Sequence, residues 1–540
     1  MFSQSGALGI AILESAARRG LGLSTFVSAG NRADVSGNDL LQFWEDDPAT
    51  DVVLLYLESF GNPRKFSRLA RRIAARKPIV AVKTGRFRYR PAAGAEPMAA
   101  PEEAVDALFR HAGVIRVSTT AELFDVAQLL AYQPLPTGRH VAIVGNSTAL
   151  GLLAADACAS VDLRVVVGPI DLGPEATAEK FAGALREAVA DPSVHAVVTV
   201  FIPPLATTND EVARVIADAA AEGGKPMLST FLAFEGVHEQ LRRVGPQGTA
   251  VQGSIPSYRS PETAVFALRR AVEYAEWRRR PRGVPPDLPD VDPDAARRVV
   301  DQALASGSPS VELSGEPLAR LLRAYGIEPW PTVMVHTAQE AVDAAARFGY
   351  PVALKAVTEQ LRHRVDLGGV LLDLRHEDDV RAAVDAVAAR LRAAPGGDVA
   401  SCEFLVQPMA APGVGTVLGS LEDPSFGPLV WFGVGGVATD LLGDRGYRLV
   451  PLTDADAAEL VRSVKAAPML FGHRGAPPVD VPALEQLLLR VAWLADDLPE
   501  VAELELNPVH VSTHGLAVLH AAVRLAPAAP RGDAGPRRMV

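Results

Sequence analysis

The feature that most constrains the fold is the alternation of short apolar runs with longer helical patterns along the chain. The runs at 52–57 and 78–83 are rich in β-branched and other apolar residues, and the segment 63–77 between them has a helical pattern. The same alternation continues through most of the sequence, which is typical of βαβ units in a mainly parallel sheet. The sequence therefore predicts an α/β fold.

Length and composition restrict the class of protein further. A chain of 540 residues exceeds what one core usually supports, and 48% hydrophobic with 22% charged residues is ordinary for a globular protein. The net charge of -11 argues against nucleic acid as a partner, because a phosphate backbone requires clustered Lys and Arg. The sequence has no signal peptide, no bilayer-length apolar run and only two cysteines, so we expect a cytoplasmic protein without a membrane partner.

Composition and a repeated motif divide the chain. Residues 1–135 and 136–277 each open with a small-residue turn and a helix, since SQSGALG in the first is similar to GNSTALG in the second. Residues 278–305 begin with a stretch rich in Pro and charge, which predicts a linker. A different α+β series follows at 306–525, and the tail 526–540 has the composition of a disordered segment.

Two motifs have the chemistry of phosphate-binding sites. In SQSGAL, Ser3, Ser5 and Gly6 would lie at a helix N-terminus, where hydroxyl and backbone N–H groups bind anions. The alternative is a serine N-cap with a glycine turn and no ligand. Lys355 ends the strand-like PVALK, where its ammonium could contact nucleotide phosphates or simply be solvated.

Two further segments carry nucleophilic and metal-binding groups. His363 precedes Asp366 and a glycine pair in HRVDLGGV, which predicts a loop with a nucleophilic imidazole. In ELELNPV, strand alternation would direct Glu505 and Asn507 to one face, an oxygen-rich arrangement suited to Mg²⁺. The same polar face could instead line solvent.

In their order along the chain these segments, together with SAGN, KPIVAVKTGR, GYPVALKA, LVQPM and GVGGV, resemble the ADP-forming (NDP-forming) acyl-CoA synthetases. This acetate–CoA ligase family is related to succinyl-CoA synthetase, and the resemblance reaches about residue 525. It implies two flavodoxin-like, succinyl-CoA-ligase-type domains with parallel sheets, followed by an α+β ATP-grasp module. Members make acyl-CoA through an acyl phosphate. Because the family's N-terminal CoA-binding domain is not in the sequence, we expect CoA or acyl-CoA to bind only with a separate domain or subunit, in a homo- or hetero-oligomer.

The resemblance also implies roles for individual residues, with ATP and Mg²⁺ as cofactors. His363 would carry phosphate on a swinging loop, Glu505 would orient the phosphohistidine, and Glu58 would support the first-site histidine. The other implied assignments are Ser3, Ser5 and Gly6 for phosphate, Lys355, Val406 and Gln407 for ATP, and Asn507 for the metal.

Three departures from the family pattern bear on activity. Gly94 occupies the position of the first-site histidine, and the sequence has no histidine between Lys83 and Phe109. Gly415 replaces an acid, and His520 replaces an aspartate that is a metal ligand in the family. Imidazole is a poor ligand for Mg²⁺, so phosphoryl transfer should suffer.

From these losses we predict a catalytically impaired, regulatory protein that senses CoA, acyl-CoA or a nucleotide, for instance in association with a GNAT acyltransferase. One alternative is an active ADP-forming acyl-CoA ligase that works through His363 with a separate CoA-binding subunit. A third hypothesis is an assembly scaffold.

Overall fold

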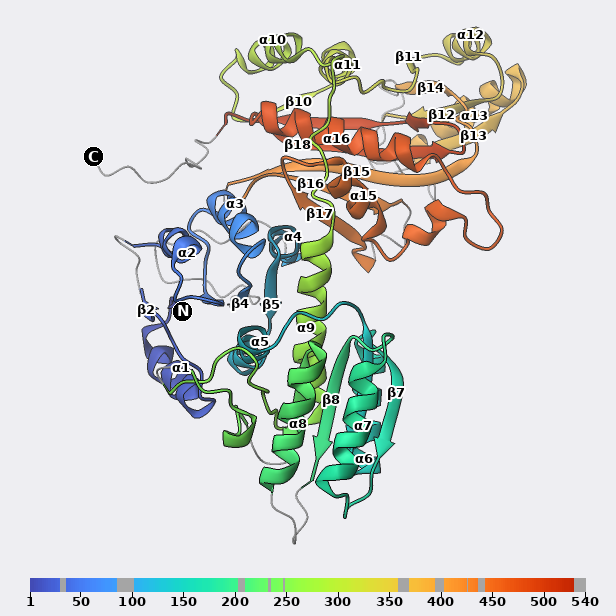
Figure 1. The fold of residues 1–540 in the computed structure, drawn as a ribbon. Coiled ribbons are helices and arrows are strands. Elements are labelled where there is room, and N and C mark those ends of the chain that lie inside the picture. The colour runs from blue at the N-terminus through green and yellow to red at the C-terminus, as the bar shows by residue number, and fades with distance from the viewer. Residues whose placement is uncertain are drawn as a thin grey trace. The chain divides into compact units, whose positions relative to one another are not determined.

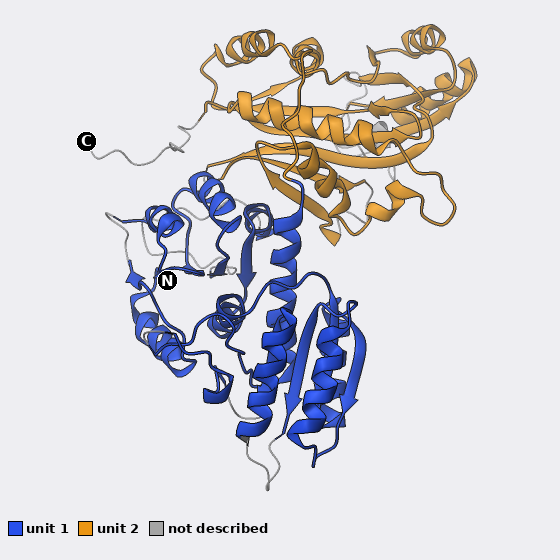
Figure 2. Ribbon diagram, viewed as in Figure 1, with its two compact units in different colours: residues 1–281, 531–540 blue, residues 282–530 orange. Residues whose placement is uncertain are grey.

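The structure is a computed structural model, and it describes residues 1–29, 35–84, 102–202, 209–231, 235–245, 248–357, 369–393, 403–424, 426–435 and 442–528. The chain forms two compact units, residues 1–281 with 531–540 and residues 282–530 (Figure 2). Of the residues singled out in the sequence, His363 and Gly94 lie outside the described residues, as does the predicted disordered tail from residue 529 onward.

The first unit opens with a five-stranded parallel sheet of order β2-β1-β3-β4-β5 (Figure 1). Every residue of β3 and β4 is buried, as expected for central parallel strands that are covered on both faces. The strands are Phe2–Ser3 (β1), Val27–Ser28 (β2), Val53–Leu57 (β3), Ile79–Lys83 (β4) and Val114–Val117 (β5), and the helices are Gly6–Arg18 (α1), Gly37–Asp46 (α2), Pro63–Ala74 (α3), Glu102–Ala112 (α4) and Thr120–Tyr132 (α5).

A second parallel sheet in the same unit has the order β7-β6-β8-β9. In both sheets the first strand lies between the next two, so each sheet has a topological switch point beside β1 or β6, where open α/β sheets usually bind ligands. The strands are His140–Gly145 (β6), Arg164–Asp171 (β7), Ala196–Phe201 (β8) and Met227–Phe231 (β9), and the helices are Thr148–Ser160 (α6), Ala178–Ala190 (α7), Asn209–Gly223 (α8), Glu239–Leu241 (η1) and Pro261–Arg279 (α9).

The second unit contains two antiparallel sheets. The smaller has the order β11-β14-β12-β13, and the larger has the order β10-β20-β18-β15-β16-β17 with β19 paired to β18. The strands are Val311–Leu313 (β10), Val333–Val335 (β11), Val352–Ala356 (β12), Val370–Leu374 (β13), Phe404–Pro408 (β14), Gly413–Asp423 (β15), Gly427–Val434 (β16), Arg445–Leu449 (β17), Val501–Ser512 (β18), Leu516–Val518 (β19) and Ala521–Leu525 (β20).

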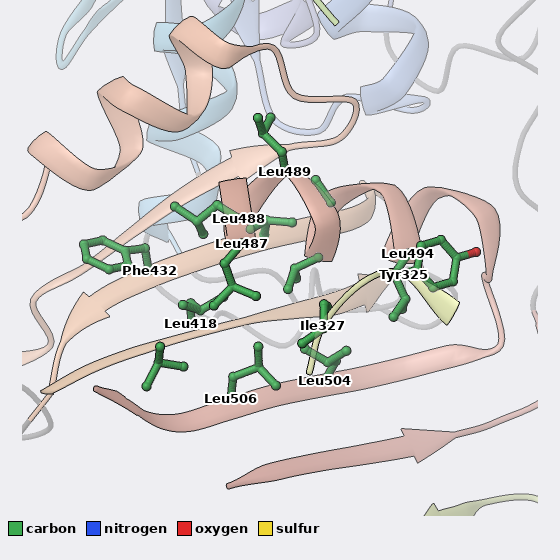
Figure 3. Close-up of a cluster of buried hydrophobic side chains, with 14 of the residues drawn as sticks. Tyr325, Ile327, Leu418, Phe432, Leu487, Leu488, Leu489, Leu494, Leu504 and Leu506 are labelled. Carbon is green, nitrogen blue, oxygen red and sulfur yellow. The ribbon is translucent and has the colours of Figure 1, made fainter. Parts of the chain in front are cut away.

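Helices flank these two sheets. They are Pro293–Leu304 (α10), Gly315–Ala324 (α11), Ala338–Phe348 (α12), Glu377–Ala393 (α13), Asp454–Arg462 (α15), Ala467–Phe471 (η2) and Val481–Asp497 (α16). Helix α16 lies along the larger sheet and contributes Leu487 and Leu488 to its core, where they meet Leu418 of β15, Phe432 of β16 and Leu504 of β18 (Figure 3). Each such side chain stabilises the fold by about 1.5–3 kcal/mol when fully buried.

The observed sheets confirm the predicted α/β fold class with two parallel domains ahead of an α+β module. Helix α10 occupies much of the predicted linker 278–305, because Val299 and Val300 of this helix are buried in the core of the second unit. The domain boundaries otherwise remain predictions. Among the described residues, no helix has the length and apolar character needed to cross a membrane.

Candidate functional site

The nucleotide-binding residues predicted in the second unit converge on one backbone carbonyl. Lys355 lies on β12 and its Nζ donates to Leu519 O at 3.4 Å. Gln407, on the neighbouring strand β14, is buried and its Nε2 donates to the same oxygen at 3.0 Å and to Thr332 Oγ1 at 2.6 Å. Because Leu519 belongs to the connection between β19 and β20, this carbonyl brings together strands of the smaller and the larger sheet.

The predicted metal-binding pair lies on β18, next to that connection. Asn507 Nδ2 donates to Glu505 Oε1 at 2.8 Å, so the two side chains are adjacent, as the alternation of ELELNPV predicted. The backbone N–H of Asn507 donates to His520 O at 3.1 Å, and Leu519 N donates to Pro508 O at 3.0 Å. The structure thus connects the carbonyl shared by Lys355 and Gln407 to the strand of Glu505 and Asn507 through the backbone of Leu519 and His520.

Burial gives this region an unusual cation. It lowers the pKa of the Lys355 ammonium from its ordinary value of 10.5 to about 8, because burial removes the charge from water and no described carboxylate offsets that cost. A bound polyphosphate would offset this desolvation and stabilise the charged ammonium. The arrangement therefore suits nucleotide phosphates.

The donor set can be tested against Mg²⁺ by its chemistry. Since the amide nitrogen of Asn507 is used in the bond to Glu505, the amide oxygen and the second carboxylate oxygen are the donors that a hard cation prefers. In the part of the chain that the structure describes, no three His, Cys, Asp or Glu side chains gather as a metal site. Mg²⁺ usually keeps water and binds through one or two carboxylates plus substrate phosphates, so the residues fit an ion that arrives with the nucleotide.

Val406, predicted to bind ATP, and Gly415, predicted to replace an acid, have no polar side chain. Val406 is fully buried in the core of the smaller sheet and pairs with Val333 and Leu354 on its two sides, so its side chain has a packing role there. At Gly415 an added Cβ would meet nothing within 4 Å among the described residues, which means that the loss of the family's acid leaves open space.

The predicted phosphate turn in the first unit follows β1. Ser3 is buried, and its hydroxyl donates to Ser5 O at 2.9 Å and accepts from Ser5 N at 3.2 Å. Ser5 is the N-cap residue of α1, but in the described structure its side chain makes no capping bond. Gly6 begins the helix and is exposed. The first-turn N–H groups of α1 thus have no serine cap, an arrangement that an anion can complete.

Sequence reasoning missed two residues beside this turn. Gln4 is buried between the predicted phosphate residues, and its Oε1 accepts from the backbone N–H of Glu58 at 2.5 Å. Lys83 ends β4, pairs in register with Leu57 of β3, and is buried enough that desolvation lowers its pKa. The exposed Glu58 therefore lies between a buried amide and a buried lysine. The SQSG and KTGR motifs contain both residues, but only Ser3, Ser5 and Gly6 were predicted to be functional.

The fold and the site together define a class of protein. Residues 302–525 match the family model of the ATP-grasp domain, and residues 1–130 match the model of the succinyl-CoA ligase like flavodoxin domain. The second unit is therefore an ATP-grasp module, preceded by a succinyl-CoA-ligase-like part, as the sequence predicted.

Whole-chain comparisons narrow this class to a family. The chain is 35% identical to acetate–CoA ligase (ADP-forming) I of Archaeoglobus fulgidus, over 96% of this chain and 76% of that relative. The subunits of acetate–CoA ligase (ADP-forming) I of Pyrococcus furiosus are also similar. The alpha subunit is 30% identical over 52% of this chain and 64% of its own length. The beta subunit is 34% identical over 40% of this chain and 90% of its own length. The chain belongs to the family of ADP-forming acetate–CoA ligases.

These findings confirm the family resemblance and bear on the competing hypotheses. The relatives are ADP-forming ligases, which supports the alternative of an active ligase better than the regulatory protein that we predicted from the three departures. None of these relatives gives evidence of catalytic loss or of a GNAT partner.

Proposed function

We propose that this chain is the nucleotide- and phosphate-handling part of an ADP-forming acyl-CoA ligase, completed by a CoA-binding domain or subunit. The observation that carries the proposal is the convergence of Lys355 and Gln407 on Leu519 O, beside the pair formed by Glu505 and Asn507. A cation, an amide donor and two oxygen ligands from three strands are the groups that positioning and charge stabilisation of a triphosphate require.

Each residue then has a role in phosphoryl transfer. Lys355 neutralises charge on the transferred phosphate, and Gln407 donates a hydrogen bond from the same strand pair. When Mg²⁺ is bound with ATP, it supplies further neutralisation of the phosphate oxygens, held by Asn507 and Glu505. A neutral imidazole nitrogen of His363 attacks the γ-phosphorus, so that an N–P bond forms, the bond to the β-phosphate oxygen breaks, and ADP leaves.

The phosphate then has to reach the carboxylic acid substrate. In our proposal His363 delivers it to the turn of Ser3, Ser5 and Gly6, whose hydroxyl and N–H groups receive an anion. Transfer to the acid breaks the N–P bond and gives an acyl phosphate, which CoA consumes with release of phosphate.

One sequence observation favours a second candidate. Because no histidine stands between Lys83 and Phe109, the relay lacks the first-site imidazole of the family. A regulatory sensor of nucleotide or acyl-CoA, acting with a GNAT acyltransferase, would bind ATP without turning it over.

Labelling with γ-phosphate-labelled ATP and Mg²⁺ separates these candidates. A ligase acquires acid-labile, base-stable label that is lost in His363→Ala and kept in His376→Ala, a control at an exposed histidine on the same module. ATP should still raise the melting temperature of His363→Ala, which shows that the variant is folded and binds nucleotide. A chain that is stabilised by ATP but never labelled is a sensor, and one that ATP neither labels nor stabilises contradicts both candidates.

A further inference from the structure

The two switch points of the first unit are built around the same side-chain group. Gln4 directly follows β1 and Asn146 directly follows β6, and their exposed fractions are only 7% and 4%. Both precede a serine and the helix that starts each domain, in the aligned motifs SQSGALG and GNSTALG. The internal similarity of the sequence thus places a carboxamide at equivalent points of the two sheets.

Each carboxamide holds the backbone beyond the neighbouring strand. Gln4 Oε1 accepts from Glu58 N at 2.5 Å and Ser59 N at 2.9 Å, and its Nε2 donates to Ser59 O at 2.7 Å. Asn146 Oδ1 accepts from Ile202 N at 2.8 Å, and its Nδ2 donates to Ile202 O at 2.8 Å. We call this two-way bonding the carboxamide clasp.

The backbone N–H groups of Gln4 and Asn146 also make equivalent hydrogen bonds to the neighbouring strand. Gln4 N donates to Tyr56 O at 3.1 Å, and Asn146 N donates to Val200 O at 3.2 Å. Counted from these acceptors, Glu58 and Ile202 are equivalent positions. Glutamine, which is one methylene longer than asparagine, also holds the residue that follows.

An amide is the group that this task requires. It presents one acceptor and one donor to a peptide N–H and C=O that have left the sheet ladder, and both groups lose these partners when the amide is removed. A carboxylate can accept but cannot donate to Ser59 O, and an apolar side chain of the same shape can do neither.

The first clasp differs from the second in what it holds. It fixes the backbone of Glu58, an exposed carboxylate, next to the uncapped start of α1. In the second domain the equivalent residue is Ile202, which lines a pocket with Asn146, Ser147 and Asp171 at the start of α6.

We propose that Gln4 is a positioning residue that sets the location of Glu58 relative to the anion-binding turn of α1. This inference rests on the proposed phosphate site. Gln4 touches neither substrate nor reacting atoms in this account. It acts by holding the backbone of Glu58 and Ser59, so its loss changes phosphate binding at the turn through the geometry of that loop.

The test is titration of the full chain with inorganic phosphate, with the nucleotide site saturated by ADP. Gln4→Met, which keeps the shape and removes both bonding functions, should weaken phosphate affinity about tenfold at every pH, because the loop of Glu58 and Ser59 is no longer held beside the turn. Gln4→Glu should be weakened at pH 8 and should recover toward the affinity of wild type at the same pH as the pH falls to 5.5. Position 4 is buried, burial raises the pKa of a carboxyl, and a protonated carboxyl regains the donor.

Gln133 offers a matched control elsewhere in the unit. Its buried amide also bonds in both directions, accepting from Met227 N at 2.9 Å and donating to Ser254 O at 2.6 Å. Gln133→Met should lower the melting temperature as Gln4→Met does, yet leave phosphate affinity within twofold of wild type. Exchange of the Ser59 amide hydrogen should speed up in Gln4→Met only.

Three outcomes with the variants would overturn the inference. They are a Gln4→Met chain that binds phosphate like wild type, equal weakening in Gln133→Met, and a Gln4→Glu chain without pH-dependent recovery. Absence of phosphate binding by the wild-type chain would also overturn it, whereas labelling at His363 would still report separately on the proposed ligase function.

Discussion

The two regions proposed to bind phosphate use opposite physical means. The turn at the start of α1 offers hydroxyl and backbone N–H groups from Ser3, Ser5 and Gly6, none of which carries a charge. The ATP-grasp module offers a partly buried ammonium, Lys355, whose pKa is lowered to about 8. Charge–phosphate bonds are the stronger of the two, while fixed dipoles hold an anion in place at any pH.

This difference between the two sites agrees with the different steps that a phosphate relay requires of them. The nucleotide site must hold a triphosphate tightly through transfer, whereas the turn must receive a phosphate and release it again. We therefore expect a strong, titratable site at Lys355 and a weaker site at the turn of α1.

The largest effect is expected from Lys355→Met. Removing a charged hydrogen-bond donor costs about 2–3 kcal/mol of binding, so ATP affinity should fall about 30- to 150-fold. Phosphate binding at the turn of α1 should not change. Calorimetric titration with ATP and then with inorganic phosphate checks both parts. Retained ATP affinity would mean that the nucleotide lies elsewhere.

A smaller effect is expected from Gly6→Asp. Among the described residues a Cβ at this position meets only Ser28 Oγ, at 3.9 Å, so the side chain fits, and an acid in the first turn favours the helix. The carboxylate should compete for the N–H groups and weaken phosphate binding about tenfold, roughly 1.4 kcal/mol. ATP affinity should be unaffected. Gly6→Asn, of the same shape without the charge, should lie between Gly6→Asp and wild type.

The smallest effect compares the two helix starts of the first unit. Ser147 caps α6, with its side chain accepting from Leu150 N, whereas Ser5 makes no such bond to α1 in the described structure. Ser147→Ala should therefore lower the free energy of unfolding by about 0.5–1 kcal/mol, and Ser5→Ala by much less. Urea unfolding of the two variants under the same conditions measures both changes in the free energy of unfolding. Equal losses would show that Ser5 is an ordinary cap, which was the alternative interpretation of the turn.

Most of the parallel architecture could be predicted from the sequence, because buried parallel strands are continuous apolar runs. The runs at β3 and β4 were both recognised. Strand β7 was missed, since most of its residues are half-buried or exposed and it contains Gly168 followed by Pro169. The helix α10 was assigned to a linker because the stretch before it is rich in Pro and charge, while its apolar face is visible only once it packs on a core.

The candidate sites were predicted less completely. The assignments of Lys355 and Asn507 came from family resemblance, because their convergence depends on Leu519, which lies 164 residues from Lys355 in the chain. No local pattern predicts such a contact. Gln4 was overlooked for a similar reason, since the function of its amide depends on partners 54 and 55 residues away. A repeated amide directly after a strand was the signal that the sequence did contain.

The central claim, that a lysine of lowered pKa carries ATP binding, is tested most directly by the pH dependence of ATP affinity in wild type and Lys355→Arg. Because the pKa of Lys355 is lowered to about 8, wild-type affinity should fall as the pH rises through 8, by up to about tenfold per pH unit. Above about pH 7.5 the phosphate groups of ATP are already ionised, and a guanidinium stays charged, so the Lys355→Arg profile should be flat. A wild-type profile that is level through pH 8, or the same decline in both proteins, would contradict the account.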